Sequence, residues 1–256
     1  MKGINDALLR VGDACKSEYY TIQNRIRRSK WVHIDETGFH VEGKKYWLWA
    51  FRSAENDVLI TVVDSRGRDV VKDTLGEDFH SPVIVDGWKA YSYLKTIQRC
   101  WAHLIREVDA FKSYEKGNEL SEEIHSMFKE LKESLKSENM DERKSMKEKF
   151  DIRIEEAVKR YDPYEELHKP VEYIKNGLGS WFTCLLYPGM EPTNNLAEQA
   201  IREHVVIRKI IGTFRSESGS QNYQYIVSLL STWRLKGLSM FVEMDKILRK
   251  ELCGFG

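Results

Sequence analysis

The sequence predicts an α/β protein in which a mixed sheet is flanked by helices and carries a charged helical insertion. Short β-prone runs follow one another through the first part of the chain. Apolar residues at helical spacing fill most of the remainder. A stretch dominated by Glu and Lys begins at about residue 113 and accounts for the insertion.

Residues 1–30 are predicted to form a helical N-terminal segment that ends in a basic cluster. This cluster consists of Arg25, Arg27, Arg28 and Lys30. Basic side chains at the C-terminal end of a helix complement its dipole. The alternative is an arm that contacts phosphate groups.

The segment from residue 31 to residue 112 is predicted as the first part of the core. It opens with strands at residues 31–40, 46–51 and 58–63, and the short links between them require an antiparallel meander. A short helix at residues 67–76 precedes an apolar strand at residues 81–85, which is typical of a strand buried on both faces.

A further strand at residues 96–100 and a helix from Trp101 complete this first part of the core. Residues 113–190 then form the mainly helical insertion, with a helical hairpin that bends at residues 137–141. Two interpretations of the hairpin stay open: a solvated insertion, or a dimerisation arm.

Residues 191–256 are predicted as the C-terminal part of the core. One helix follows Asn195 and runs through Ile201, and a second covers residues 222–235. A local basic patch accompanies them, formed by Arg202, Arg208, Lys209 and Arg215. Because the net charge of the 256-residue chain is zero, any attraction to nucleic acid has to come from such a patch.

The composition places the protein in a reducing, cytoplasmic setting. Its four cysteines are scattered and show neither a disulfide framework nor paired zinc spacing. No signal peptide is recognisable, and no apolar run approaches the length of about 18 residues that spans a membrane.

Three acidic residues form the candidate catalytic site: Asp35 in the first strand, Asp86 at the C-terminal end of the strand at 81–85, and Glu198 in the helix after Asn195. Alternation with Val32 and Ile34 separates Asp35 from the apolar face of its strand. Oxygen ligands of this kind suit two Mg²⁺ ions that act on phosphodiesters.

Each acid also has a structural interpretation. Asp35 could cap a turn or pair with a lysine, and Asp86 with Gly87 could form a turn. Glu198 could complete a capping box with Asn195 as the N-cap, or pair with Arg202 at i+4.

The motifs taken in order resemble the DDE transposases of the insertion-sequence 66 family over nearly the whole chain. The matching stretches are HIDET at 33–37, WLW at 47–49, DGWKAY at 86–91, CWAHLIR at 100–106, NNLAEQAIR at 194–202, RK at 208–209 and GTFRS at 212–216. The resemblance implies a ribonuclease H-like core that cuts and joins transposon DNA ends. It also implies that Asp35, Asp86 and Glu198 bind Mg²⁺, with Mn²⁺ as an alternative.

The resemblance also implies binding partners, and the chain departs from the usual family pattern in one respect. Double-stranded DNA, as transposon ends and target, is the expected partner, with a homo-oligomer assembled on it. The predicted insertion explains the 198 − 86 = 112 positions between the last two acids. Family members usually carry a DNA-binding region ahead of the core, so the chain is predicted to be a truncated copy or a catalytic domain. The alternative function is a non-catalytic remnant that binds DNA or a partner transposase.

Two further groups of residues have open roles. Cys100 and His103 stand at i and i+3, which is a weak zinc signal without a second ligand pair, so we expect an accessory structural or DNA-positioning role. The aromatic residues Trp88, Tyr91 and Trp101 either stack on an unpaired base or belong to the core.

Overall fold

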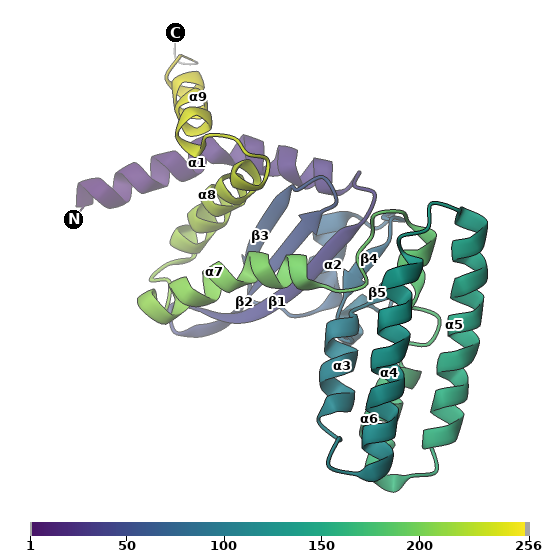
Figure 1. Ribbon diagram of the computed structural model, residues 1–256. Coiled ribbons are helices and arrows are strands. Elements are labelled where there is room, and N and C mark those ends of the chain that lie inside the picture. The colour runs from purple at the N-terminus through teal and green to yellow at the C-terminus, as the bar shows by residue number, and fades with distance from the viewer. Residues whose placement is uncertain (1, 254–256) are drawn as a thin grey trace. The chain divides into compact units, whose positions relative to one another are not determined.

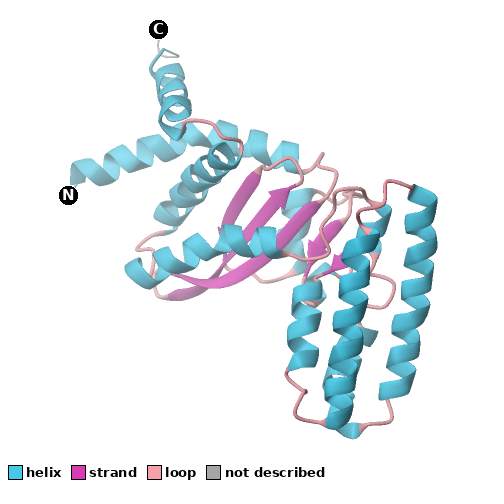
Figure 2. Cartoon of the chain, in the orientation of Figure 1, coloured by secondary structure: helices cyan, strands magenta, loops and turns pink. Residues whose placement is uncertain are grey.

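The computed structural model describes residues 2–253 of the chain and contains two compact units. The first unit comprises Met1–Ser81 and Leu196–Gly256, and the second comprises Pro82–Asn195. Both units contain helices and strands (Figure 2). The described strands pair both antiparallel and parallel, which confirms the predicted α/β class. The predicted division into an interrupted core and an insertion stays a prediction.

The first unit is built on an antiparallel meander, as predicted. Its strands are β1 (Val32–Val41), β2 (Lys44–Ser53) and β3 (Val58–Val63). The β1–β2 turn has positive φ at both central residues, 52° at Glu42 and 76° at Gly43. This geometry matches the twist of a tight hairpin, so the two-residue link fixes the register of the pair.

Helices cover this sheet on both faces. The helices of the first unit are α1 (Lys2–Ile26), α2 (Arg68–Leu75), α7 (Asn195–Ile211), α8 (Glu217–Leu235) and α9 (Met240–Cys253), of which α9 packs on α1 and α8 rather than on the sheet. Helix α7 lies across one face (Figure 1), where Ile201 joins a buried cluster with Phe39, Ala50 and Ile60. Helix α1 contacts β2 and β3.

Two of these helices are longer than predicted. Helix α7 continues ten residues beyond Ile201, because no breaker occurs before Gly212, whose φ of 72° suits a helix end. Helix α8 begins at Glu217 rather than at residue 222. Its N-cap is Ser216, whose side chain accepts a hydrogen bond from the Gly219 N–H.

Helix α8 satisfies the outer edge of β3 with side chains. Three alternate N–H groups of the strand donate to three polar side chains spaced four residues apart on the helix. The pairs are Val58 with Thr232 (2.9 Å), Ile60 with Ser228 (2.8 Å) and Val62 with Gln224 (2.9 Å). The helix therefore takes the place of a neighbouring strand along this edge.

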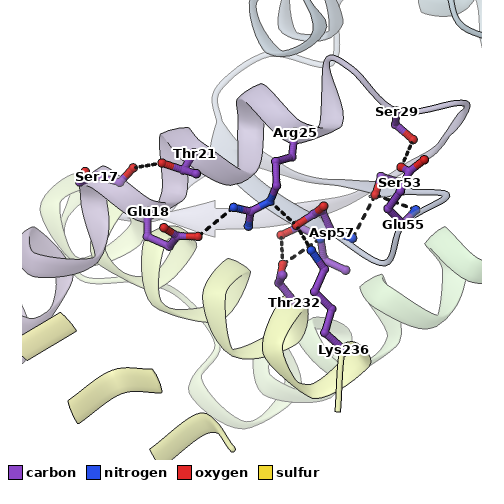
Figure 3. A network of polar contacts seen from close by, with 11 residues as sticks. Ser17, Glu18, Thr21, Arg25, Ser29, Ser53, Glu55, Asp57, Thr232 and Lys236 are labelled. Carbon is purple, nitrogen blue, oxygen red and sulfur yellow. Dashed lines mark hydrogen bonds and ion pairs between the residues drawn. The ribbon is translucent and has the colours of Figure 1, made fainter. Parts of the chain in front are cut away.

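A buried carboxylate joins the β2–β3 turn to both ends of the first unit (Figure 3). Asp57 is 2% exposed, and its Oδ1 accepts from Arg25 Nε of α1 at 2.8 Å and from Lys236 Nζ at the end of α8 at 2.7 Å. Its backbone N–H donates to Ser53 Oγ. Arg25, predicted either to complement the helix dipole or to contact phosphate, instead holds this turn.

The second unit combines two parallel strands with helices that run side by side (Figure 1). Its elements are β4 (Val83–Val85), η1 (Lys89–Tyr91), β5 (Ile97–Arg99), α3 (Trp101–Asp109), α4 (Glu115–Ser134), α5 (Met140–Tyr161), η2 (Glu165–Leu167), α6 (His168–Lys175) and η3 (Thr183–Leu186). The predicted helical hairpin corresponds to α4 and α5.

The apolar stripe of this hairpin is buried inside the second unit. Ile124, Leu131 and Ile154 are fully buried, and Phe150 stacks on Phe182 at 5.0 Å between ring centroids. A stripe that is already covered offers no seam to a second chain. The buried stripe gives no support to the dimerisation arm, and the insertion stays a prediction. No helix in the described part of the chain combines the length and apolarity that crossing a bilayer requires.

The edge contacts of α8 generate a prediction for stability. Replacing Ser228 by Ala leaves the buried Ile60 N–H without its acceptor, so the free energy of unfolding should fall by about 1–3 kcal/mol. Urea denaturation followed by circular dichroism measures the change. Ser231→Ala is the matched control, because the Ser231 hydroxyl makes no hydrogen bond to the described residues. Equal losses in the two variants would contradict the edge-capping role.

Candidate active site

Asp35 lies on the face of the first-unit sheet that α7 covers. It shares the parity of Phe39 and Val41 along β1 and stands opposite Ala50 of β2, and all three of these neighbours belong to the buried cluster with Ile201. Asp35 therefore stands on the strand face opposite to Val32 and Ile34, as the alternation predicts. It is half-buried, and its nearest neighbours on this face of β1 are the polar residues His33 and Thr37.

The adjacent acid, Glu36, has a different role on the opposite face. Its side chain is 1% exposed and forms an ion pair with Arg66 at 2.7 Å. The Arg66 guanidinium also lies over the ring of Trp47, 4.6 Å from its centroid. Glu36 is thus held by a structural partner.

Glu198 stands in the first turn of α7. Ala197 and Ile201 belong to the buried stripe of the helix, and Glu198 is half-buried on the flank of this stripe. The helix begins at Asn195, which moves Glu198 from the third to the fourth helical position, so the predicted capping box is wrong. Arg202 is exposed and forms no ion pair with the described residues.

Asp86 directly follows β4, as predicted, in the second unit. Its Oδ1 accepts the N–H of Trp88 at 2.8 Å, which fixes the carboxylate in a local turn. Asp86 also lines a cavity of about 270 Å³ together with Trp88, Tyr91 and Arg99. The Asp86–Gly87 turn and a cavity therefore occur together at this strand end.

Cys100 anchors backbone within the second unit. It is fully buried as the N-cap of α3, its N–H donates to Val85 O at 2.9 Å, and its Sγ accepts the N–H of Asn194 at 3.2 Å. The neighbouring Trp101 N–H donates to Pro192 O. Cys100 therefore fixes the segment that leads into α7, which supports the structural side of its expected accessory role. His103 is half-buried one turn into α3.

The aromatic candidates of this region divide between core and surface. Trp101 is fully buried and lies 5.4 Å from Phe128 between ring centroids, so it belongs to the core. Tyr91 is 2% exposed, whereas Trp88 is 40% exposed. Of the three, Trp88 alone presents a ring to solvent.

The structure places the three predicted acids on both units. Asp35 and Glu198 belong to the first unit, and Asp86, Cys100 and His103 belong to the second. The meeting of all three carboxylates around metal stays a prediction.

The predicted basic patch divides into anchored and exposed members. The Arg208 guanidinium donates to Gly38 O and, at 3.4 Å, to Thr37 Oγ1 on β1, so Arg208 holds α7 against the strand of Asp35. Arg202, Lys209 and Arg215 are exposed. The sequence shows that basic residues gather in this segment, but it does not show which of them binds the protein backbone.

The segment after α7 returns to the end of β1. The Phe214 N–H donates to His40 O at 3.1 Å, and the Glu42 N–H donates to Phe214 O at 2.8 Å. The Phe214 ring also stacks on Phe39, 5.0 Å away. The stretch at 212–216 is therefore fixed on the first-unit sheet, with Arg215 exposed beside it.

His204 fastens α7 to α8. It is 2% exposed, its Nδ1 lies 2.6 Å from Tyr223 Oη, and its Nε2 has no partner among the described residues. Burial lowers the pKa of His204 from 6.5 to about 4, with a smaller lowering from Arg234 and an opposing effect of Glu203. The imidazole is therefore neutral at physiological pH.

A family model described as "Transposase IS66 family" matches residues 2–222. The match covers most of the chain and places it in the class of transposases. The chain belongs to the IS66 family, so the resemblance predicted from the motifs is confirmed.

An uncharacterized protein of Sinorhizobium fredii (strain NBRC 101917 / NGR234), y4qI, is similar to this chain at 23% identity over 253 residues. The alignment covers 85% of this chain and 47% of that protein, so the chain spans about half the length of this curated relative. No solved structure matches the chain.

The buried imidazole of His204 generates a pH prediction. Its folded pKa lies below its unfolded value, so the unfolded chain takes up the proton first as the pH falls. The stability that the neutral imidazole contributes is complete above about pH 6.5 and is lost as the pH falls toward 4, by about 3 kcal/mol in total. His204→Asn should reduce the loss of stability over this window in denaturant titrations.

His40→Asn is the matched control for this measurement. His40 is exposed on β1 of the same unit, so this variant makes the same substitution at the surface rather than in the contact between α7 and α8. The assignment fails if the parent and His204→Asn lose stability equally between pH 6.5 and 4.

Proposed function

We propose that this chain forms the ribonuclease H-like catalytic core of a DDE transposase, which cleaves transposon DNA ends and transfers the strands to target DNA. The observation that carries the proposal is the placement of two acids: Asp35 stands on the face of β1 that α7 covers, and Glu198 stands in the first turn of α7. Carboxylates that meet at one site repel each other unless a cation or a proton offsets their charge.

The donor set suits a hard divalent cation. Asp35, Asp86 and Glu198 offer oxygen ligands only, which Mg²⁺ prefers and Mn²⁺ accepts. Each acid belongs to, or directly follows, a regular element, and the Trp88 N–H orients one oxygen of Asp86. When bound, the metal would activate an attacking hydroxyl and stabilise the leaving oxygen.

DNA binding is assigned in this proposal to the basic side chains of α7 and of the segment that follows it. Exposed Arg202, Lys209 and Arg215 would contact the phosphate backbone of double-stranded DNA, with no dependence on base sequence. Arg208 would serve less as a DNA contact than as the tie between α7 and β1. Assembly of several copies on DNA is part of the same proposal.

The exposed cations generate a binding prediction. The double variant Lys209→Ala with Arg215→Ala should weaken binding to every duplex alike. It should also reduce the slope of log affinity against log salt by about two, because two phosphate contacts are lost. Fluorescence anisotropy over a range of salt concentrations measures both effects.

A charge-matched control removes two exposed lysines from the helices of the second unit, Lys129→Ala with Lys149→Ala. Affinity and slope should then equal those of the parent. If the Lys209 and Arg215 variant binds as tightly as the parent at every salt concentration, the basic patch is not the DNA-binding face. Exposed Arg28 and Lys30 would become the better candidates.

The acidic site generates a separate prediction for chemistry. Glu198→Gln should abolish Mg²⁺-dependent cleavage of a transposon-end duplex. DNA binding should be retained or slightly improved, because a negative charge near phosphate is removed. Gel analysis of labelled ends measures cleavage, and anisotropy measures binding.

Glu203→Gln is the control on the same helix. Glu203 is exposed and forms an ion pair with Arg234 at 2.6 Å, so its loss should leave cleavage near the parent rate. Cleavage by the Glu198→Gln variant at the parent rate would refute the catalytic assignment.

A further inference from the structure

The cavity beside Asp86 contains a buried arginine that forms no ion pair with the described residues. Arg99, at the end of β5, is 7% exposed and lines this cavity. Its guanidinium lies 5.0 Å from the ring centroids of both Tyr173 and Trp181. No carboxylate in the described part of the chain forms an ion pair with it.

Few of the Arg99 donors are used. Nη1 donates to Asn176 O at 3.2 Å, the guanidinium also hydrogen-bonds the Tyr173 side chain, and the buried Nε has no hydrogen-bond partner among the described residues. A guanidinium carries five N–H donors and stays charged in proteins. A buried cation without a close ion pair is unfavourable, so an anionic ligand at the free donors would offset part of the cost of burying Arg99.

The backbone beside Arg99 leaves room for this group. A Cβ at Gly87 would lie 2.3 Å from Arg99 Nη2, so glycine at this position allows the guanidinium to occupy its place. Gly87 follows Asp86 directly, and both line the cavity with Arg99. The glycine of the DGW motif therefore places a cation beside the acid.

The chemistry of the cavity identifies the class of ligand. The two aromatic rings lie over the guanidinium, so the free donors are those along its edge. Edge donors of arginine match the oxygens of a phosphate group. Ser92 and Ser180 add polar groups to the wall of the cavity, whose volume of about 270 Å³ accommodates a phosphate.

We propose that the Arg99 cavity binds a phosphate group. A phosphate and the Asp86 carboxylate repel each other unless a cation lies between them. Under the proposed function, metal at Asp86 would remove this repulsion, and the phosphate would belong to the bound DNA strand. This assignment to DNA rests on the proposed function, whereas the phosphate site itself does not.

The first experiment tests the site with inorganic phosphate and no DNA. The melting temperature is measured against phosphate concentration at constant ionic strength, with chloride as the reference salt. Phosphate should raise the melting temperature of the parent, since a ligand that binds only the folded state stabilises it. Arg99→Gln should abolish the rise, whereas Arg153→Gln should retain it, because Arg153 lies on α5 and pairs with Glu130.

A second variant keeps the test decisive if Arg99→Gln folds poorly. Gly87→Ala retains the arginine but displaces its guanidinium, and it should also abolish the rise. The proposal is overturned if phosphate stabilises either variant as much as the parent. It is also overturned if adenosine or guanosine, which lack phosphate, stabilises the parent as strongly as phosphate does, because the cavity would then take a base.

The second experiment assigns the phosphate to DNA. Arg99→Gln should reduce the salt slope of duplex binding by about one in the presence of Mg²⁺, while Arg153→Gln leaves it unchanged. An unchanged slope for Arg99→Gln would overturn the DNA assignment while leaving the proposed transposase function intact. Absence of DNA binding by the parent would instead refute the proposed function, and the phosphate melting curves would still decide the site.

Discussion

The first unit depends on a single buried carboxylate. Asp57 binds a cation from α1 and another from the end of α8, two helices that are 211 residues apart at these contacts (236 − 25). Because the side chain of Asp57 is 3% exposed, water cannot replace either partner. Removing one partner of a buried pair typically costs about 3–5 kcal/mol. The turn between β2 and β3 thus holds both ends of the unit on the same sheet.

This clamp sets the positions on which the candidate site relies. Lys236 stands four residues after Thr232, so the ion pair fixes α8 along β3 at the first of its three edge contacts. Tyr223 of α8 then contacts His204 of α7, and Arg208 ties α7 to β1. Glu198 belongs to the same helix, so its position in the first unit depends on contacts far from this acid.

The sequence predicts the elements well because their signals are local. β-prone runs separated by tight turns give the meander, and helical periodicity gives α4 and α5. The period of two along a strand also orients Asp35 correctly, since the alternating apolar neighbours determine both faces. The ends of α7 and α8 are less well predicted, because the breaker at Gly212 and the cap at Ser216 outweigh the apolar pattern used to define them.

Buried polar contacts are not predicted from the sequence, because the two residues that form each contact are far apart along the chain. Arg143 is 3% exposed and donates to Cys184 O and Leu185 O, yet it stands in a Lys- and Glu-rich helix that predicts exposure. Arg208 lies in a basic patch and binds a strand carbonyl, and Arg99 lies next to the CWAHLIR motif and binds between two aromatic rings. In each case the sequence shows the charged residue, whereas only the structure shows which groups its side chain contacts.

The hydrogen bonds between α8 and β3 are possible because the advance along four helical residues is nearly equal to the advance along two strand residues. Four residues of helix advance about 6.0 Å, and two residues of antiparallel strand advance about 6.8 Å. The difference of about 0.8 Å per step is small over the three contacts made by Gln224, Ser228 and Thr232. A fourth contact would be displaced by about 2.4 Å, too far for a hydrogen bond of ordinary length. A helix can therefore seal only a short strand in this way, and the six residues of β3 lie within that limit, which closes this edge of the meander to strands of other molecules.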